Sequence, residues 1–219
     1  MNTRLRASRS RNALEKPRLS AIINYYLSAS SPWTYLGHPR LAALAKLYDA
    51  TIVLRPVDFG RVFAVSGGLP LPQRPMQRRA YRTWELKRWK AWLEDPMNVE
   101  PKYFPVAAQR AAQLIIAAEP LGMHAQMAVA YATMRAVFVE DRNIADRDVM
   151  LAVAKEQGVP DTLVAEAEKA SVQATYEAYT QEAINHQVFG APTYILDGEP
   201  FWGQDRLDFL ERALASRTG

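Results

Sequence analysis

Residues 21–34 read AIINYYLSASSPWT and join two different apolar patterns. The first part, residues 21–27, is short, β-branched and aromatic, which is typical of a buried strand. The pattern changes at Pro32, a residue that suits the first position of a helix, and apolar residues then recur every three or four positions up to Leu47. The stretch therefore predicts a strand that leads directly into a helix, with Ser31 at the start of that helix.

Three further strands are predicted, one soon after the first helix and two near the end of the chain. Residues 51–56 form a second apolar run soon after the first helix, which predicts a parallel pair of strands joined by a crossover. Near the end of the chain, residues 193–196 read as a strand, Asp197 and Gly198 as a turn, and residues 200–202 as a short antiparallel partner. A last helix is predicted at residues 205–215.

The middle of the chain, from about residue 62 to residue 186, contains no further β-branched run. Apolar residues at helical spacing predict helices at residues 76–93, 107–118, 125–138, 146–156 and 172–184. The predicted order is therefore β-α-β, a helical insertion, then β-β-α. This order predicts one α/β domain from residues 19–60 and 187–219 and an inserted helical domain from residues 61–186, with the active site in the cleft between them.

Composition limits the chemistry. Hydrophobic residues make up 49% of the 219 residues and charged residues 23%, which is ordinary for a globular protein. There is no cysteine, so structural disulfides, cysteine zinc sites and cysteine nucleophiles are excluded. The three histidines lack metal-ligand spacing, and no metal is expected. Any sulfur chemistry must use the sulfur of another molecule.

The positive charge lies at the start of the chain. Residues 1–18 carry a net charge of +5 and the remaining residues a net charge of −1, which gives +4 for the whole chain. Residues 1–18 are expected to be a mobile arm, and a transit peptide or an RNA-binding tail are the alternatives. No apolar run approaches the roughly 18 to 20 residues of a membrane span, so we expect a soluble, cytoplasmic protein without a membrane partner.

Two positions combine a special backbone with polar groups. Ser31 opens a helix whose first amides are unpaired, and such a helix start stabilises an anion. The alternative is that Ser31 is only a helix N-cap. Pro192 directly precedes a predicted strand, which favours a cis bond or a tight turn, and the alternative is a proline that merely begins an edge strand.

A basic and aromatic run at residues 74–92 is typical of a nucleic-acid-binding patch. Its helical spacing, however, places the charges and the rings on different faces. We therefore expect the tryptophans in the core, the charges in solvent and no nucleic-acid partner. The residues concerned are Arg74, Arg78, Arg79, Arg82, Lys87, Arg88 and Lys90, with Trp84, Trp89 and Trp92.

Four motifs in order carry a resemblance that covers residues 22–214. They are SPWTYL at 31–36, Tyr81 with ELKRW at 85–89, VFGAPT at 188–193 and FWGQDRL at 201–207. Together they resemble the glutathione-dependent 2-hydroxychromene-2-carboxylate isomerases and the similar kappa-class glutathione transferases. The resemblance implies a thioredoxin-like α/β fold with a large helical insertion, as in DsbA. It also implies glutathione as cofactor, a small aromatic substrate and a possible homodimer.

The resemblance also implies roles for residues. Ser31 and Thr34 stand where thiol oxidoreductases of this fold have a Cys-x-x-Cys pair, so Ser31 would be the catalytic residue that donates a hydrogen bond to the glutathione sulfur. The glutathione-binding residues would be Pro32, Trp33, Arg78, Ala191, Pro192, Gln204 and Asp205. In this set Ala191 would pair its main chain with the cysteinyl part of glutathione, and Gln204 and Asp205 would hold the γ-glutamyl end.

Arg78 would hold the glycyl carboxylate. Apart from the resemblance, a subset of the basic and aromatic run, Arg78 and Arg82 with Tyr81, could serve glutathione and an aromatic acid instead of lying in solvent. Gly67 stands where relatives carry an asparagine, so that contact is in doubt. The implied reaction is the addition of an activated thiolate to a conjugated keto acid, rotation and elimination. A transferase or peroxidase acting on another electrophile is the alternative enzyme, and a non-catalytic thioredoxin-fold binding protein is the alternative outside enzymes.

Overall fold

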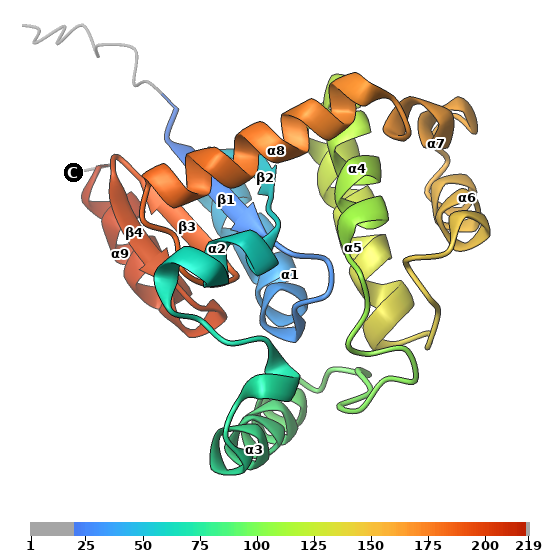
Figure 1. The fold of residues 1–219 in the computed structure, drawn as a ribbon. Helices are drawn as coiled ribbons and strands as arrows, with labels where there is room; N and C mark the ends of the chain where they lie inside the picture. The colour runs from blue at the N-terminus through green and yellow to red at the C-terminus, as the bar shows by residue number, and fades with distance from the viewer. Residues whose placement is uncertain (1–19, 218–219) are drawn as a thin grey trace, which may run out of the picture.

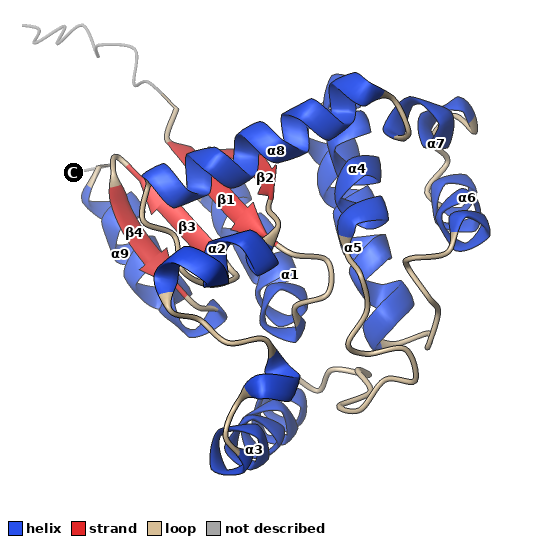
Figure 2. Cartoon of the chain, viewed as in Figure 1, coloured by secondary structure: helices blue, strands red, loops and turns tan. Residues whose placement is uncertain are grey.

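The structure is a computed structural model that describes residues 20–217. A four-stranded sheet has the order β2-β1-β3-β4 (Figure 2). Its strands are β1 (Ile22–Leu27), β2 (Thr51–Pro56), β3 (Thr193–Leu196) and β4 (Glu199–Trp202). β1 and β2 are parallel and joined through α1 (Pro32–Leu47), whereas β3 pairs antiparallel with both β1 and β4. The predicted parallel pair and the predicted hairpin are both confirmed.

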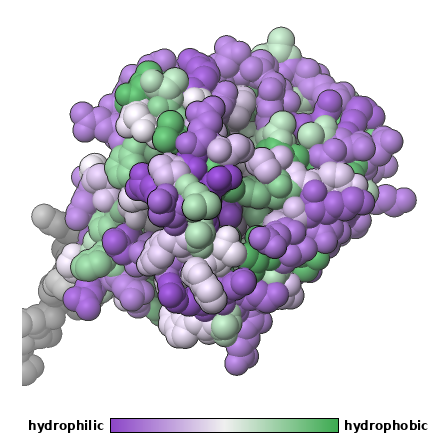
Figure 3. All heavy atoms as spheres, turned by 60° about the horizontal axis from the view of Figure 1, so that its bottom comes forward, coloured by the Kyte–Doolittle hydropathy of each residue, from purple (hydrophilic) through white to green (hydrophobic). Residues whose placement is uncertain are grey.

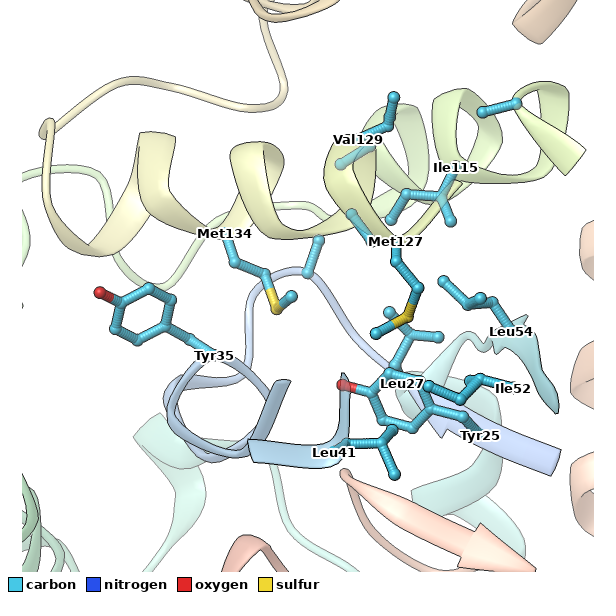
Figure 4. Packing of buried hydrophobic residues seen from close by; sticks show 14 of the residues in the cluster. Tyr25, Leu27, Tyr35, Leu41, Ile52, Leu54, Ile115, Met127, Val129 and Met134 are labelled. Carbon is cyan, nitrogen blue, oxygen red and sulfur yellow. The ribbon is translucent and has the colours of Figure 1, made fainter. Parts of the chain in front are cut away.

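Alternate side chains of the central strands enter two different cores, as the pleat of a strand requires. Tyr25 and Leu27 of β1 belong to the larger core, which lies between the sheet, α1 and α5 (Met123–Phe138). Figure 4 shows Met127 and Met134 of α5 pointing toward this side of the sheet and toward α1. Tyr26 points to the opposite face and joins a second, smaller core.

Helices cover both faces of the sheet (Figure 1). α1 and α9 (Leu207–Ser216) lie on the face of the larger core, and α2 (Phe59–Ser66) and α8 (Ala170–Asn185) lie on the other. Between α2 and α8 the chain forms α3 (Met76–Trp92), α4 (Gln109–Ala117), α5, α6 (Arg147–Glu156) and α7 (Thr162–Ala167). Residues 57–192 contain no strand, as predicted.

Two helices, α2 and α7, are not predicted from the sequence. α2 has 8 residues and α7 has 6, so each is too short to show a helical period clearly. α2 is stabilised at its start by Asp58, whose side chain accepts from the amides of Gly60 and Arg61. Single-turn 3-10 helices at Leu71–Gln73, Glu119–Leu121 and Gln204–Arg206 complete the chain.

α8 returns from the inserted helices to the sheet. The Tyr26 hydroxyl donates to Glu182 of α8 at 2.7 Å, and Arg55 of β2 donates to the same carboxylate at 3.2 Å. The amide of Asp58 donates to the Thr180 hydroxyl at 3.1 Å. These bonds join the helix before the last strands to the first half of the chain.

α3 corrects one prediction. Leu86 is its buried residue, and Trp89 packs partly against the core, but the rings of Trp84 and Trp92 are 60% and 66% exposed. The expectation that the tryptophans lie in the core is therefore wrong for these two. The reason is that only one face of α3 contacts the rest of the molecule, so rings spaced around the helix cannot all be covered. Among the described residues no helix is long and apolar enough to cross a membrane.

Candidate functional site

Ser31 is the N-cap of α1. Its backbone is extended, with φ −96° and ψ 119°, and its Oγ accepts from the Thr34 amide at 3.2 Å. The first turn of α1 contains no acidic residue, so no side-chain anion of that turn neutralises the positive end of the helix dipole. Ser31 is half-buried. The helix start is thus arranged to stabilise a negative charge brought by a ligand.

Ser31 faces the loop before β3. The Ala191–Pro192 peptide bond is cis, and the Ser31 hydroxyl donates to the Ala191 carbonyl at 3.4 Å, across 160 positions of sequence. The cis bond that the sequence favours at Pro192 is confirmed, and this bond lies beside Ser31. Among residues 20–217 no group accepts from the Ala191 amide. This amide is therefore open to a ligand that pairs with the main chain.

Two buried hydroxyls of the site lack partners within the described part of the chain. They belong to Thr34, in the first turn of α1, and to Tyr194 on β3. Both residues are fully buried. A buried hydroxyl without a hydrogen bond is costly, so the Thr34 hydroxyl next to Ser31 is suited to a polar atom supplied from outside the chain.

Gln204 is held against α1. Arg40 donates to its side-chain oxygen at 2.7 Å and to its main-chain oxygen at 3.0 Å. Gly37 allows the close approach, because a Cβ at this position would lie 2.7 Å from the Tyr194 hydroxyl and 2.9 Å from the Gln204 Cβ. Asp205 is exposed and pairs with Arg206 at 2.7 Å. No motif in the sequence marks Arg40, because it acts through a partner 164 positions away.

The other predicted residues are less closely joined. Pro32 is buried in the first turn of α1, and the half-buried Trp33 beside it packs against the main core. Arg78 lies exposed on α3, and no contact joins it to Ser31, Ala191 or Gln204 within the described chain. Gly67, which stands where relatives carry an asparagine, ends α2 in the left-handed conformation with φ 75°. Asparagine tolerates this conformation better than most residues, so the backbone there suits either residue.

A row of aromatic rings packs between α1, α5 and β1. Tyr131 of α5 stacks on Tyr35 at 5.7 Å and on His38 at 5.8 Å, and His38 contacts Tyr25 at 5.7 Å. Nε2 of His38 lies 3.0 Å from the Met127 carbonyl, so it carries the proton, and Nδ1 accepts from the Tyr25 hydroxyl at 3.2 Å. Burial lowers the pKa of His38 to about 4. This histidine is therefore a neutral core residue at pH 7.

Burial also raises the pKa of Tyr35, and the Asp95 carboxylate, which accepts from its hydroxyl at 2.9 Å, acts in the same direction. Tyr35 is thus a protonated hydrogen-bond donor, which fixes the chain after α3 to the first turns of α1. Among residues 20–217 no group of acidic residues and histidines is placed to hold a metal ion.

The fold and the site define a class: thioredoxin-fold proteins of the DsbA-like kind. Residues 22–215 match the family model described as DSBA-like thioredoxin domain. The chain is 32% identical to a 2-hydroxychromene-2-carboxylate isomerase from Pseudomonas putida over 88% of this chain and 94% of the relative. It is 27% identical to a protein of the same name from Sphingobium xenophagum, over 90% and 99%. The chain therefore belongs to the DsbA-like thioredoxin family and, within it, to the family of the 2-hydroxychromene-2-carboxylate isomerases.

Solved structures agree with this assignment. A 2-hydroxychromene-2-carboxylate isomerase structure matches with a TM-score of 0.74 and 26% identity, over 89% of this chain and 95% of that chain. A probable DsbA oxidoreductase from Streptomyces coelicolor matches with a TM-score of 0.73 at 14% identity, over 91% and 90%. The second likeness is one of fold alone. A thioredoxin-like domain with helices inserted between its second and third strands is thus the fold of this chain.

Proposed function

We propose that this protein is an isomerase that uses glutathione to convert 2-hydroxychromene-2-carboxylate or a closely similar aromatic keto acid. The observation that carries the proposal is the pairing of Ser31 with Ala191. A hydroxyl at a helix start lies 3.4 Å from the carbonyl that precedes a cis proline, in a chain without any cysteine. The names of the relatives supply the reaction class.

The residues present fit a bound thiolate. The start of α1 has no acidic residue, and the buried Thr34 hydroxyl has no partner among the described residues. When bound, glutathione would supply a thiolate that adds reversibly to the conjugated acid, so that rotation and elimination follow without net oxidation or reduction. Ser31 would turn its hydroxyl from the Ala191 carbonyl to the sulfur and hold the sulfur in its charged form.

The main chain of Ala191 would bind the cysteinyl part of the tripeptide as an added strand, because its amide is open. Arg40 holds Gln204 by its side-chain oxygen, which leaves the amide nitrogen of Gln204 to donate to the γ-glutamyl carboxylate. Asp205 would take the γ-glutamyl ammonium in exchange for Arg206. Arg78 would take the glycyl carboxylate, since its guanidinium has no acidic partner within the described residues.

The test is a panel of substrates assayed with and without glutathione. The panel holds 2-hydroxychromene-2-carboxylate, a chlorodinitrobenzene-type electrophile and a peroxide. We expect isomerisation of the carboxylate to require glutathione and to exceed turnover of the other two. Preferred turnover of the electrophile or the peroxide would support a transferase or a peroxidase instead. Glutathione binding without turnover of any substrate would support a binding protein.

A further inference from the structure

One arginine of α3 stands apart from the other charged residues of that helix. Arg82 is half-buried, and its guanidinium carbon lies 5.0 Å from the centre of the Phe104 ring. Within residues 20–217 the side chain of Arg82 forms no ion pair and no hydrogen bond. Burial lowers its pKa to about 10, and the nearby positive charge of Arg74 acts in the same direction, so Arg82 remains charged at pH 7.

The surroundings of Arg82 are positive. Arg78 and Arg82 are four residues apart and share one face of α3. Arg74 lies just before this helix, and the charges of Arg74 and Arg82, and of Arg74 and Arg78, are close enough to interact. Arg74 donates its Nε proton to the Leu69 carbonyl at 2.7 Å, a neutral partner. The acidic residue of α3, Glu85, pairs with Arg88 instead. Like charges this close are unfavourable, and an anion would relieve the repulsion.

Ring contacts connect Arg82 to the start of α1. The Phe104 ring lies 6.0 Å from the ring of Phe138, which in turn lies 5.6 Å from the ring of Tyr35. Tyr35 follows the Thr34 hydroxyl directly in α1. The guanidinium is thus separated from the helix start by a short row of aromatic rings.

Figure 3, which brings the end of the molecule that carries α3 forward, shows hydrophilic and hydrophobic residues side by side on this face.

Building on the proposed function, we propose that Arg82 is a specificity-determining residue that binds the carboxylate of the aromatic substrate, while its Phe104 neighbour contacts the substrate ring. A guanidinium stacked on a ring keeps its edge N–H groups free, and these groups match the two oxygens of a carboxylate. Arg78, one turn earlier and exposed, is left to the cofactor. Arg82 would therefore select for acids over neutral electrophiles.

The first arm of the test measures binding without catalysis. Cinnamate, a flat aromatic carboxylate, and cinnamamide, its neutral analogue, are titrated calorimetrically into the wild-type protein and its variants in the presence of glutathione. Arg82→Met, which keeps the apolar stem over Phe104, should weaken cinnamate binding at least about tenfold and leave cinnamamide binding within about twofold. Arg82→Lys should restore part of the loss. Arg79→Met, on the exposed side of the same helix, is the matched control and should change neither.

The second arm measures kinetics. Arg82→Met should raise KM for the carboxylate substrate at least about tenfold, with KM for glutathione within about threefold of wild type. Unchanged cinnamate affinity in Arg82→Met, or equal losses for cinnamate and cinnamamide, would overturn the proposal. The absence of any cinnamate binding by the wild-type protein would overturn it too. If the wild-type protein binds cinnamate through Arg82 but isomerises nothing, the proposed function fails and the carboxylate site stands.

Discussion

At the scale of single residues, the site depends on hydroxyls that the protein leaves without strong partners. The Ser31 hydroxyl makes a long bond of 3.4 Å to a carbonyl, and the Thr34 hydroxyl makes none among the described residues. A strong internal bond would have to be broken before a ligand could bind. The long bond leaves the half-buried Ser31 hydroxyl available to a ligand atom, which is the condition that a thiolate site requires, whereas the Thr34 hydroxyl is fully enclosed.

Ser31→Ala should separate thiolate stabilisation from binding. A hydrogen bond to a charged partner contributes roughly 1.5 to 3 kcal/mol, so its loss should raise the pKa of the bound glutathione thiol by about one to two units. Turnover at neutral pH should fall, while the affinity for glutathione should stay within a few fold. The pKa is measured from the ultraviolet absorbance of the thiolate across a pH series.

Ser30→Ala is the control for that change, because the only described partner of the Ser30 hydroxyl is the Ser28 hydroxyl, at 3.1 Å. It should leave the thiol pKa and the turnover unchanged. Equal turnover of Ser31→Ala and wild type at neutral pH would refute the role of Ser31.

His38 predicts a pH dependence of stability. Its pKa is about 4 in the folded protein and 6.5 when exposed, so the unfolded chain binds more protons between these values. The stabilisation is complete above pH 6.5 and is lost as the pH falls from 6.5 to 4. The difference corresponds to about 3 kcal/mol. Urea denaturation at pH 7 and pH 4.5 measures it.

His38→Gln keeps hydrogen-bonding groups but cannot be protonated, so it should be less stable than wild type at pH 7 and lose less stability on acidification. The same loss on acidification in both proteins would show that His38 is not the residue responsible. Exposed carboxylates contribute equally to the two proteins, so the difference between them isolates the histidine.

At the scale of secondary-structure elements, α1 positions both sides of the site. Its start carries Ser31, and its second and third turns, through Gly37 and Arg40, hold the 3-10 helix that carries Gln204 and Asp205. Arg40 also lies 5.6 Å from the ring centre of Trp89, so the same helix contacts α3. One helix thus sets the distance between Ser31 and Gln204.

Gly37→Ala tests this arrangement. Alanine normally favours a helix by about 1 kcal/mol over glycine, but here its Cβ would lie 2.7 Å from a fully buried Tyr194 hydroxyl. Overpacking of this kind costs about 1 to 3 kcal/mol, so the variant should be less stable and should bind glutathione more weakly as the 3-10 helix shifts. Urea denaturation and calorimetry measure the two effects.

Ala43→Ser, on the exposed side of α1, should leave glutathione binding unchanged and lower stability by no more than about 0.5 kcal/mol, the helix-propensity cost of serine. A Gly37→Ala variant that is more stable than wild type and binds glutathione equally well would show that the close approach does not position Gln204.

At the scale of the whole molecule, α8 connects the inserted helices to the sheet. Figure 1 shows it extending from the sheet to the end of α4. Its Glu182 accepts from Tyr26 of β1 and from Arg55 of β2, so one carboxylate contacts two strands. The insertion is therefore fastened to the sheet by its last helix as well as by its first connection.

A double-mutant cycle of Tyr26→Phe and Glu182→Gln should show coupling of about 1 kcal/mol in the free energy of unfolding, because the bond is half-buried and involves a charge. The single variants should still unfold in one transition. Tyr48→Phe with Glu211→Gln is the matched control, because this pair is more exposed and longer, at 3.3 Å, and should couple less. Equal coupling energies in the two cycles would show that the Tyr26–Glu182 bond does not attach α8 to the sheet more strongly than an exposed bond would.

The sequence alone determined the order of the elements and the two halves of the site. The β-branched run before Pro32 marked the first strand and helix, and Pro192 marked the cis bond, because these signals are local and depend on backbone chemistry. The motifs also indicated the family. Short helices such as α2 were not predicted, because so few residues do not show a clear helical period. The exposed position of Trp84 was not predicted either, because it depends on how α3 packs against the rest of the molecule.

Only the tertiary structure decided which residues meet. Ser31 and Ala191 are 160 positions apart, and Arg40 and Gln204 are 164 apart, so no local pattern could pair them. The same holds for the surroundings of Arg82, because only packing places its guanidinium over the Phe104 ring, and Glu85 of the same helix pairs with Arg88. Local backbone preferences depend on neighbouring residues in the sequence. The environment of a side chain depends on segments that only folding brings together.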